Sequence, residues 1–198
     1  MTLFAQYRFF SRDSTHAAFL AGVKTPTGDT DERELEGGLF EAEQQPGSDS
    51  WDPFVGIAID KSWGNTGLSA NILYTLTSEG TQNTDLGDVF NYNLALSHRV
   101  FYPEGGHDHG THAHGAGIID YVDLLIELNG DNRQKSVIAG DKEENTGGHI
   151  LYLSPGVRVG LAHSWSVFAS VGIPLVNDIN GEQSEPDYRV IAGISKSF

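Results

Sequence analysis

Four histidines and an aspartate lie within eight consecutive residues of this 198-residue chain. Imidazole is a good ligand for zinc, copper and nickel, and histidine-rich tracts are typical metal binders. The glycines around the histidines would let the segment wrap an ion. The alternative is a flexible polar connector that binds metal only loosely and needs no cofactor. The candidate metal ligands are His107, His109, His112 and His114.

A second group of candidate ligands is the acidic stretch 29–43. Its carboxylates could bind a divalent cation through oxygen or attract cationic solutes, although their spacing does not match an EF-hand. We interpret the stretch mainly as a solvated surface loop. The acids are Asp29, Asp31, Glu32, Glu34, Glu36, Glu41 and Glu43.

No motif indicates catalysis. The chain lacks Gly-x-Ser-x-Gly, His-Glu-x-x-His and the phosphate-binding Gly-x-x-x-x-Gly-Lys. It has no cysteine, which excludes a thiol nucleophile and a thiolate metal site. We therefore expect no enzyme activity and assign no catalytic residue.

The elements that would position these groups are β-strands, because hydrophobicity repeats with a period of two along most of the chain. We predict about nine strands of about 8–13 residues, whereas typical globular strands have about 5–6 and membrane-spanning strands about 9–11. The predicted strands are 3–10, 16–25, 53–63, 66–77, 90–100, 118–128, 150–161, 165–175 and 187–198.

The connections alternate in length, with tight turns at 11–15, 64–65 and 162–164; only 102–116 breaks the pattern, since it belongs to the short-turn rim but is long. Long polar loops at 26–50, 78–88, 129–148 and 177–186 carry most of the 27 acidic residues. Short turns on one rim and long loops on the other are the pattern of outer-membrane barrels. We predict a single all-β domain, 1–198: an antiparallel up-and-down transmembrane barrel with a His-rich connector at 102–116.

Polar positions on the predicted strands would face the lumen of such a barrel. They would line a water-filled path in a wide barrel, or pair across the interior and seal a narrow one. The lumen-lining candidates are Lys24, Asn71, Asn91, Asn93, Arg99, Asp123, Glu127, Arg158 and Arg189.

The last strand resembles the C-terminal signal by which the barrel assembly machinery recognises outer-membrane proteins through added strand pairing. Lys196 departs from this pattern, since that position is usually hydrophobic, and it could snorkel at the interface. The signal residues are Tyr188, Val190, Ala192, Ile194 and Phe198. Aromatic residues near strand ends fit interfacial girdles. They are Trp51, Trp63, Trp165, Tyr102, Tyr152 and Tyr188.

Several stretches together resemble a family of bacterial outer-membrane transporters named for the meta-cleavage pathway of phenol degradation. They are GVKTPTG (22–28), GGLF (37–40), GSDSWDP (47–53), DLGDVFNY (85–92), LSPG (153–156) and SEPDY (184–188). The resemblance implies passive passage of small solutes, aromatic or hydrophobic compounds among them, across the bacterial outer membrane. Members carry a signal peptide and further N-terminal strands, so we expect this chain to be a truncated piece of a barrel with a larger, even strand number.

Expected partners are outer-membrane lipid and lipopolysaccharide, the assembly machinery and a small solute. Nucleic acid is not expected, since the net charge is -15. The rival interpretation is a soluble or periplasmic β-barrel or sandwich that binds a transition metal through the His-rich loop. The two differ in which side chains face inward, because a soluble barrel buries its apolar face. Tyr74, Leu94 and Val171 would be buried in a soluble protein and would face lipid in a membrane barrel.

Overall fold

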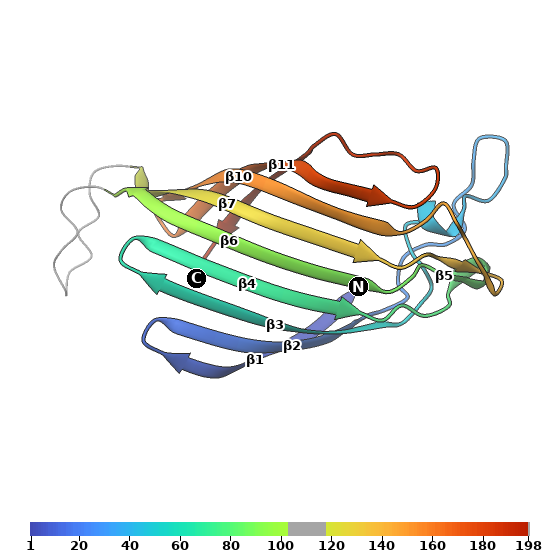
Figure 1. Cartoon of the computed structure of the whole chain (residues 1–198), viewed down its shortest axis with the longest axis horizontal. Helices are drawn as coiled ribbons and strands as arrows, with labels where there is room; N and C mark the ends of the chain where they lie inside the picture. Colours follow the sequence, from blue (N-terminus) through green and yellow to red (C-terminus); the bar gives the residue numbers. More distant parts are fainter. Residues whose placement is uncertain (103–117, 198) are drawn as a thin grey trace.

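The computed structural model describes residues 1–102 and 118–197. Nine long strands form one antiparallel sheet in which each strand pairs with the next long strand along the chain (Figure 1). Three short strands in the loops form a separate small sheet. The long strands are β1 Thr2–Arg12, β2 Thr15–Lys24, β3 Asp52–Trp63, β4 Thr66–Thr75, β6 Val89–Phe101, β7 Ile119–Arg133, β10 Gly148–Leu161, β11 Trp165–Ile179 and β12 Arg189–Lys196. The all-β, antiparallel, up-and-down prediction is confirmed. Within the described ranges, no helix has the length and apolar character needed to cross a bilayer.

The two ends of the sheet differ. At one end three connections are tight turns, and residues with positive φ occur in them, as short hairpin loops between twisted strands require. Asp13 and Ser14 form a two-residue loop, and His163 and Ser164 belong to the three-residue loop 162–164. At the other end the loops form two 3₁₀ turns and a small three-stranded sheet (Figure 1). These are η1 Ala42–Gln44, η2 Thr81–Asn83, β5 Thr84–Asp85, β8 Val137–Ile138 and β9 Asp141–Lys142.

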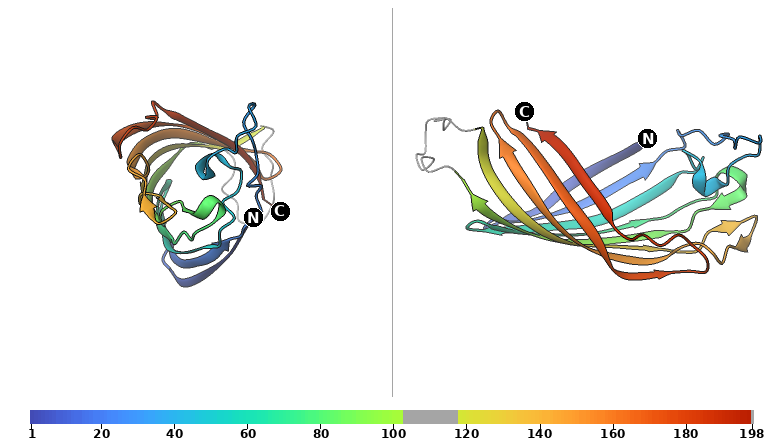
Figure 2. Two further views of the ribbon diagram at one scale, coloured as in Figure 1. Left: turned by 90° about the vertical axis from the view of Figure 1, so that its right-hand side faces the viewer. Right: turned by 90° about the horizontal axis from the view of Figure 1, so that it is seen from above.

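The sheet curls into a trough (Figure 2). Among the described residues β1 pairs only with β2 and β12 only with β11, so the trough is not closed into a barrel. Register shifts occur in β1 between Arg8 and Phe10 and in β6 between Arg99 and Phe101. Such bulges increase local twist, which helps a sheet to curve.

The two faces of the trough have opposite character. Asp123, Tyr152 and Ser154 are buried on one face, as expected for the concave side, where side chains converge. The convex face is apolar and exposed: 43% of Leu94, 55% of Ile126 and 44% of Val171 are accessible. Of the ten buried polar or charged residues in the described chain, seven lie outside the nine-stranded sheet and three, Asp52, Asp123 and Ser154, lie on its strands. The arrangement is inverted relative to a water-soluble β-protein, whose apolar face would be covered.

Two long strands extend further than predicted. β7 continues to Arg133 and β11 to Ile179, where the sequence analysis placed polar loops. The pairing of β7 with β10 runs without interruption from Asn129 through Arg133. Polar residues normally indicate a loop, but here Asn129 and Asp131 occupy positions on the inner face of a strand.

Aromatic rings cover several glycines inside the strands. The Tyr121 ring lies over Gly160 on the concave face, and the Tyr92 ring lies over Gly130 on the convex one. A Cβ at either glycine would overlap the ring. Glycine normally weakens a strand, and a cross-strand aromatic ring compensates by packing on its bare backbone.

Candidate functional site

All predicted lumen positions lie on strands, and the register places them on the concave face. The alternation on each strand and the pairing of Asn71 with Asn93, and of Asn93 with Asn129, define one common side. Cross-strand partners in an antiparallel pair point to the same face. The set is Lys24, Asn71, Asn91, Asn93, Arg99, Asp123, Glu127, Arg158 and Arg189.

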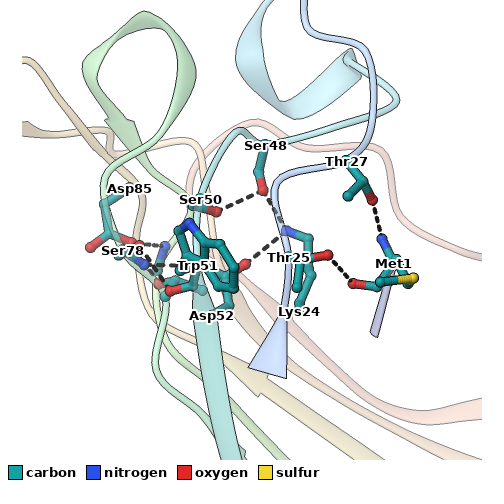
Figure 3. Close-up of polar contacts among 12 residues, drawn as sticks. Met1, Lys24, Thr25, Thr27, Ser48, Ser50, Trp51, Asp52, Ser78 and Asp85 are labelled. Carbon is teal, nitrogen blue, oxygen red and sulfur yellow. Dashed lines mark hydrogen bonds and ion pairs between the residues drawn. The ribbon is translucent and has the colours of Figure 1, made fainter. Parts of the chain in front are cut away.

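Lys24 belongs to a polar cluster at the loop end of the trough (Figure 3). Its Nζ lies 2.7 Å from Asp52 Oδ2 and also donates to Ser48. Asp52 is only 3% exposed, and its other oxygen accepts the Ser78 backbone N–H at 3.3 Å. Since Ser48 and Ser78 belong to different loops, the ion pair fastens two of the long loops to the ends of β2 and β3.

A chain of side-chain hydrogen bonds crosses the middle of the concave face. Arg189 Nη2 donates to Asn129 Oδ1 at 2.7 Å, and Asn129 Nδ2 donates to Asn93 Oδ1 at 3.1 Å. Asn93 Nδ2 then donates to Asn71 Oδ1 at 3.0 Å. We call these four residues the amide relay. It joins β4, β6 and β7, which are successive long strands, to β12, which is far from them in sequence.

Arg189 reaches Asn129 by lying flat across two strands. Its guanidinium carbon is 4.2 Å from the centre of the Tyr152 ring, a cation–π contact. A Cβ at Gly172 would lie 2.9 Å from Arg189 Cγ, so the glycine leaves the space through which the side chain passes. Arg189 Nε is buried and has no hydrogen-bond partner in the structure.

A second arginine lies nearer the turn end of the trough. Arg99 Nε and Nη2 bind the two carboxylate oxygens of Asp123 at 2.8 and 3.2 Å. The guanidinium also stacks on the Tyr121 ring, 4.1 Å from its centre. Unlike Arg189, Arg99 therefore has its charge neutralised in a bidentate pair.

The other predicted lumen residues make fewer contacts. Asn91 donates to Asp131 at 2.7 Å, and Glu127 accepts a long 3.5 Å bond from Asn129. Arg158 is exposed on the concave face, and none of the four ion pairs between described residues includes it. Asn91 and Glu127 thus bind side chains of the same concave face, as expected for residues that line an open space.

Cavities occur at both ends of the concave face. One of about 350 Å³ at the loop end is lined by Glu43, Asp131, Arg133 and Gln183 among others. Another of about 260 Å³ at the turn end is lined by Asn65, Ser97, Arg99 and Asp123 among others. β6 and β7 run between these cavities, and their inward side chains are largely polar.

The long loops are connected to one another at the loop end. η1 lies within the curve of the sheet when the molecule is viewed along its long axis (Figure 2, left). Glu43 of η1 accepts a hydrogen bond from Ser136 at 2.8 Å, and Gln82 donates to the Phe40 carbonyl at 2.9 Å. Lys135 forms an ion pair with Glu144 that lowers the pKa of the Glu144 carboxyl.

The proposed metal ligands receive no structural support. His107, His109, His112 and His114 lie outside the described residues, so the His-rich site stays a prediction. Titration of nickel into wild type and a variant with these four histidines changed to alanine would test it. Within residues 1–102 and 118–197 no group of three or more His, Asp or Glu side chains could hold a metal ion, the acidic stretch 29–43 included.

The C-terminal strand presents Val190, Ala192 and Ile194 outward, Tyr188 is exposed just before it, and Phe198 lies outside the described residues. Lys196 lies over the Trp165 ring, 5.1 Å from its centre. Five of the girdle candidates are exposed, with Trp51 at the loop end and Trp63 at the turn end. The five are Trp51, Trp63, Tyr102, Trp165 and Tyr188.

Tyr152 was wrongly expected in the aromatic girdle. It is 8% exposed on the concave face beneath Arg189, because the register of β10 turns it inward.

Four inward residues are not among the lumen positions predicted from the sequence: Asn129, Tyr152, Ser154 and Tyr121. Ser154 Oγ donates to Asn129 Oδ1 at 2.8 Å, so both belong to the surroundings of the relay. Extending the alternation of β7 by one step beyond Glu127 would have placed Asn129 inward. The stacking of Tyr152 and Tyr121 under arginines from other strands leaves no signal in a single sequence.

Comparisons with known proteins agree with the resemblance described above. Residues 2–175 match a family described as "Putative MetA-pathway of phenol degradation", and the match ends inside β11. A search of curated proteins gives no match. The match covers most of the chain, and the chain therefore belongs to this phenol-degradation family.

Proposed function

We propose that this protein is a porin-like transporter of the bacterial outer membrane that lets small solutes diffuse passively along its polar inner face. The observation that supports this most strongly is the inverted distribution of side chains, with large apolar residues exposed on the outer face and polar or charged residues on the inner one. Lipid tails tolerate an apolar outer face, whereas water would penalise one of this extent.

The rival, a soluble metal-binding β-protein, requires the opposite orientation. Leu94 and Val171 would have to be covered, yet 43% and 44% of them are exposed on the convex face. Tyr74 lies on the same face, half-buried, with its hydroxyl bound to Asp88 at 2.7 Å. The outward orientation of Tyr74, Leu94 and Val171 favours the membrane interpretation.

A pore in a membrane needs its two sheet edges paired, because an unpaired backbone group in lipid costs several kcal/mol. β1 and β12 would have to pair with each other or with further strands during assembly. The barrel assembly machinery would recognise β12 by strand addition. Lipid and lipopolysaccharide would then cover the convex face.

The long loops would restrict entry at one mouth. η1 lies inside the curve of the sheet, and the hydrogen bond between Glu43 and Ser136 holds it there. The family's name supports aromatic or hydrophobic compounds as the solutes. No residue is assigned a catalytic role.

The experiment has two stages. The protein is extracted in detergent and tested for a change of gel mobility on heating, which folded outer-membrane barrels show. It is then reconstituted in planar bilayers, where stepwise single-channel conductance is expected. Folding without detergent in the aqueous fraction, or a folded membrane-inserted protein with no conductance, would overturn the proposal.

A further inference from the structure

We propose that the amide relay is the selectivity element of the pore and that it binds solutes through an anionic oxygen, such as that of a carboxylate. The inference rests on the proposed function, since it assumes that solute passes along the concave face. It assigns a specific ligand chemistry to Arg189, Asn129, Asn93 and Asn71.

The direction of the relay follows from its first member. A guanidinium can only donate hydrogen bonds, so Asn129 must present its oxygen to Arg189. Asn129 then has only its NH₂ group to offer Asn93, and Asn93 in turn offers its NH₂ to Asn71. One cation therefore fixes the orientation of three amides.

The last member of the relay faces the open trough. Asn71 uses its oxygen to accept from Asn93, and its side chain is exposed on the concave face. Its NH₂ group makes no hydrogen bond within the described part of the chain, so it is free to donate into the lumen. Successive hydrogen bonds polarise one another, which makes this terminal donor stronger. A hydrogen bond from such a donor is strongest to an ionised oxygen.

The positive charge of Arg189, at the other end of the relay, also favours an anionic ligand. Arg189 takes part in none of the ion pairs found among the described residues, in contrast to Arg99 and Lys24. Its Nε lacks an acceptor altogether. Glu127 touches the relay only through its 3.5 Å contact with Asn129. The positive charge of Arg189 is therefore incompletely compensated, and an anion in the lumen would complete it.

The test measures the permeability of two probes of similar size and opposite charge, benzoate and benzylammonium, from reversal potentials across planar bilayers. Wild type is expected to favour benzoate. Arg189→Gln removes the cation and should lower the benzoate-to-benzylammonium ratio about tenfold, the equivalent of about 1.4 kcal/mol.

Arg158→Gln is the matched control. Arg158 also faces the lumen and takes part in none of the ion pairs between described residues, but no hydrogen bond of the relay depends on it. A loss in Arg158→Gln equal to that in Arg189→Gln would show that lumen charge in general sets selectivity, and it would overturn the proposal.

Asn71→Asp tests the relay even if Arg189→Gln fails to fold. Aspartate can still accept the bond from Asn93, so the wall is preserved, but the terminal donor becomes a negative charge. The benzoate preference should be lost or reversed, and an unchanged ratio would overturn the proposal. Absence of conductance in wild type would instead refute the pore itself, so the two failures are distinguishable.

Discussion

The same strands present two surfaces that are organised by different rules. On β6, Leu94 and Leu96 point outward and are exposed, while Asn91 and Asn93 point inward and each bind a side chain on β7. The outer surface needs only apolar character, whereas the inner surface depends on individual donors and acceptors. Substitutions outside should therefore respond to polarity, and substitutions inside should respond to chemical identity.

The largest effect is expected from a charge at the centre of the outer face. Ile126→Arg places a guanidinium midway along β7, where lipid would surround it, at a cost of about 2–4 kcal/mol. Assembly should be strongly reduced, as measured by the folded fraction on unheated gels.

Ala95→Arg is the control for this change. Ala95 faces the lumen on the neighbouring strand, directly opposite Glu127, and should accept the charge. If both variants assembled equally well, the convex face could not be in contact with lipid.

The next largest effect concerns the ion pair between Arg99 and Asp123. Asp123→Asn would leave Arg99 without its counter-charge in a partly desolvated site, and we expect a loss of about 1–3 kcal/mol, less than for a fully buried pair because Arg99 is partly exposed. Urea unfolding in detergent micelles measures it. Asp13→Asn, in the exposed pair with Arg12, should change stability by less than about 0.5 kcal/mol. Equal losses in the two variants would contradict the importance of burial on the inner surface.

A third prediction concerns the ring that covers Gly160. Gly160→Ala introduces a methyl group into the space of the Tyr121 ring, and overpacking of this kind costs about 1–3 kcal/mol. Combining it with Tyr121→Ser should recover part of that loss, because the new methyl group no longer meets a ring. Strictly additive effects in the double-mutant cycle would show that the two residues do not interact.

The smallest effect concerns pH at the loop end. The hydrogen bond and charge of Lys135 lower the pKa of Glu144 below its ordinary value of 4.5. For a carboxyl with a lowered pKa, the stabilising contact is present above the ordinary value and is lost as pH falls through the lowered one. Amide exchange in the loop around Lys135 should therefore increase in acid. Glu144→Gln should abolish this increase, and a pH response that persists in the variant must come from another group.

The sequence predicted the strands better than the site. Alternation located all nine long strands, since a strand with two different surroundings shows its period directly. The ends of β7 and β11 were predicted as loops because they are polar. On β7 the polar residues Asn129 and Asp131 instead line the trough. Individual lumen positions followed from alternation, but their partners did not. Arg189 and Asn129 are 60 residues apart, and their contact depends on the curvature of the sheet and on the gap at Gly172.

The glycines beneath aromatic rings have a consequence for how such sequences diverge. Neither Gly160 nor Tyr121 can change freely while the other stays, since a larger residue needs the ring removed and a lost ring exposes bare backbone. The same constraint joins Gly130 with Tyr92 and Gly193 with Phe168. Related proteins should therefore exchange the two members of each pair together, so that covariation would report the register of neighbouring strands even where hydrophobicity alone is uninformative.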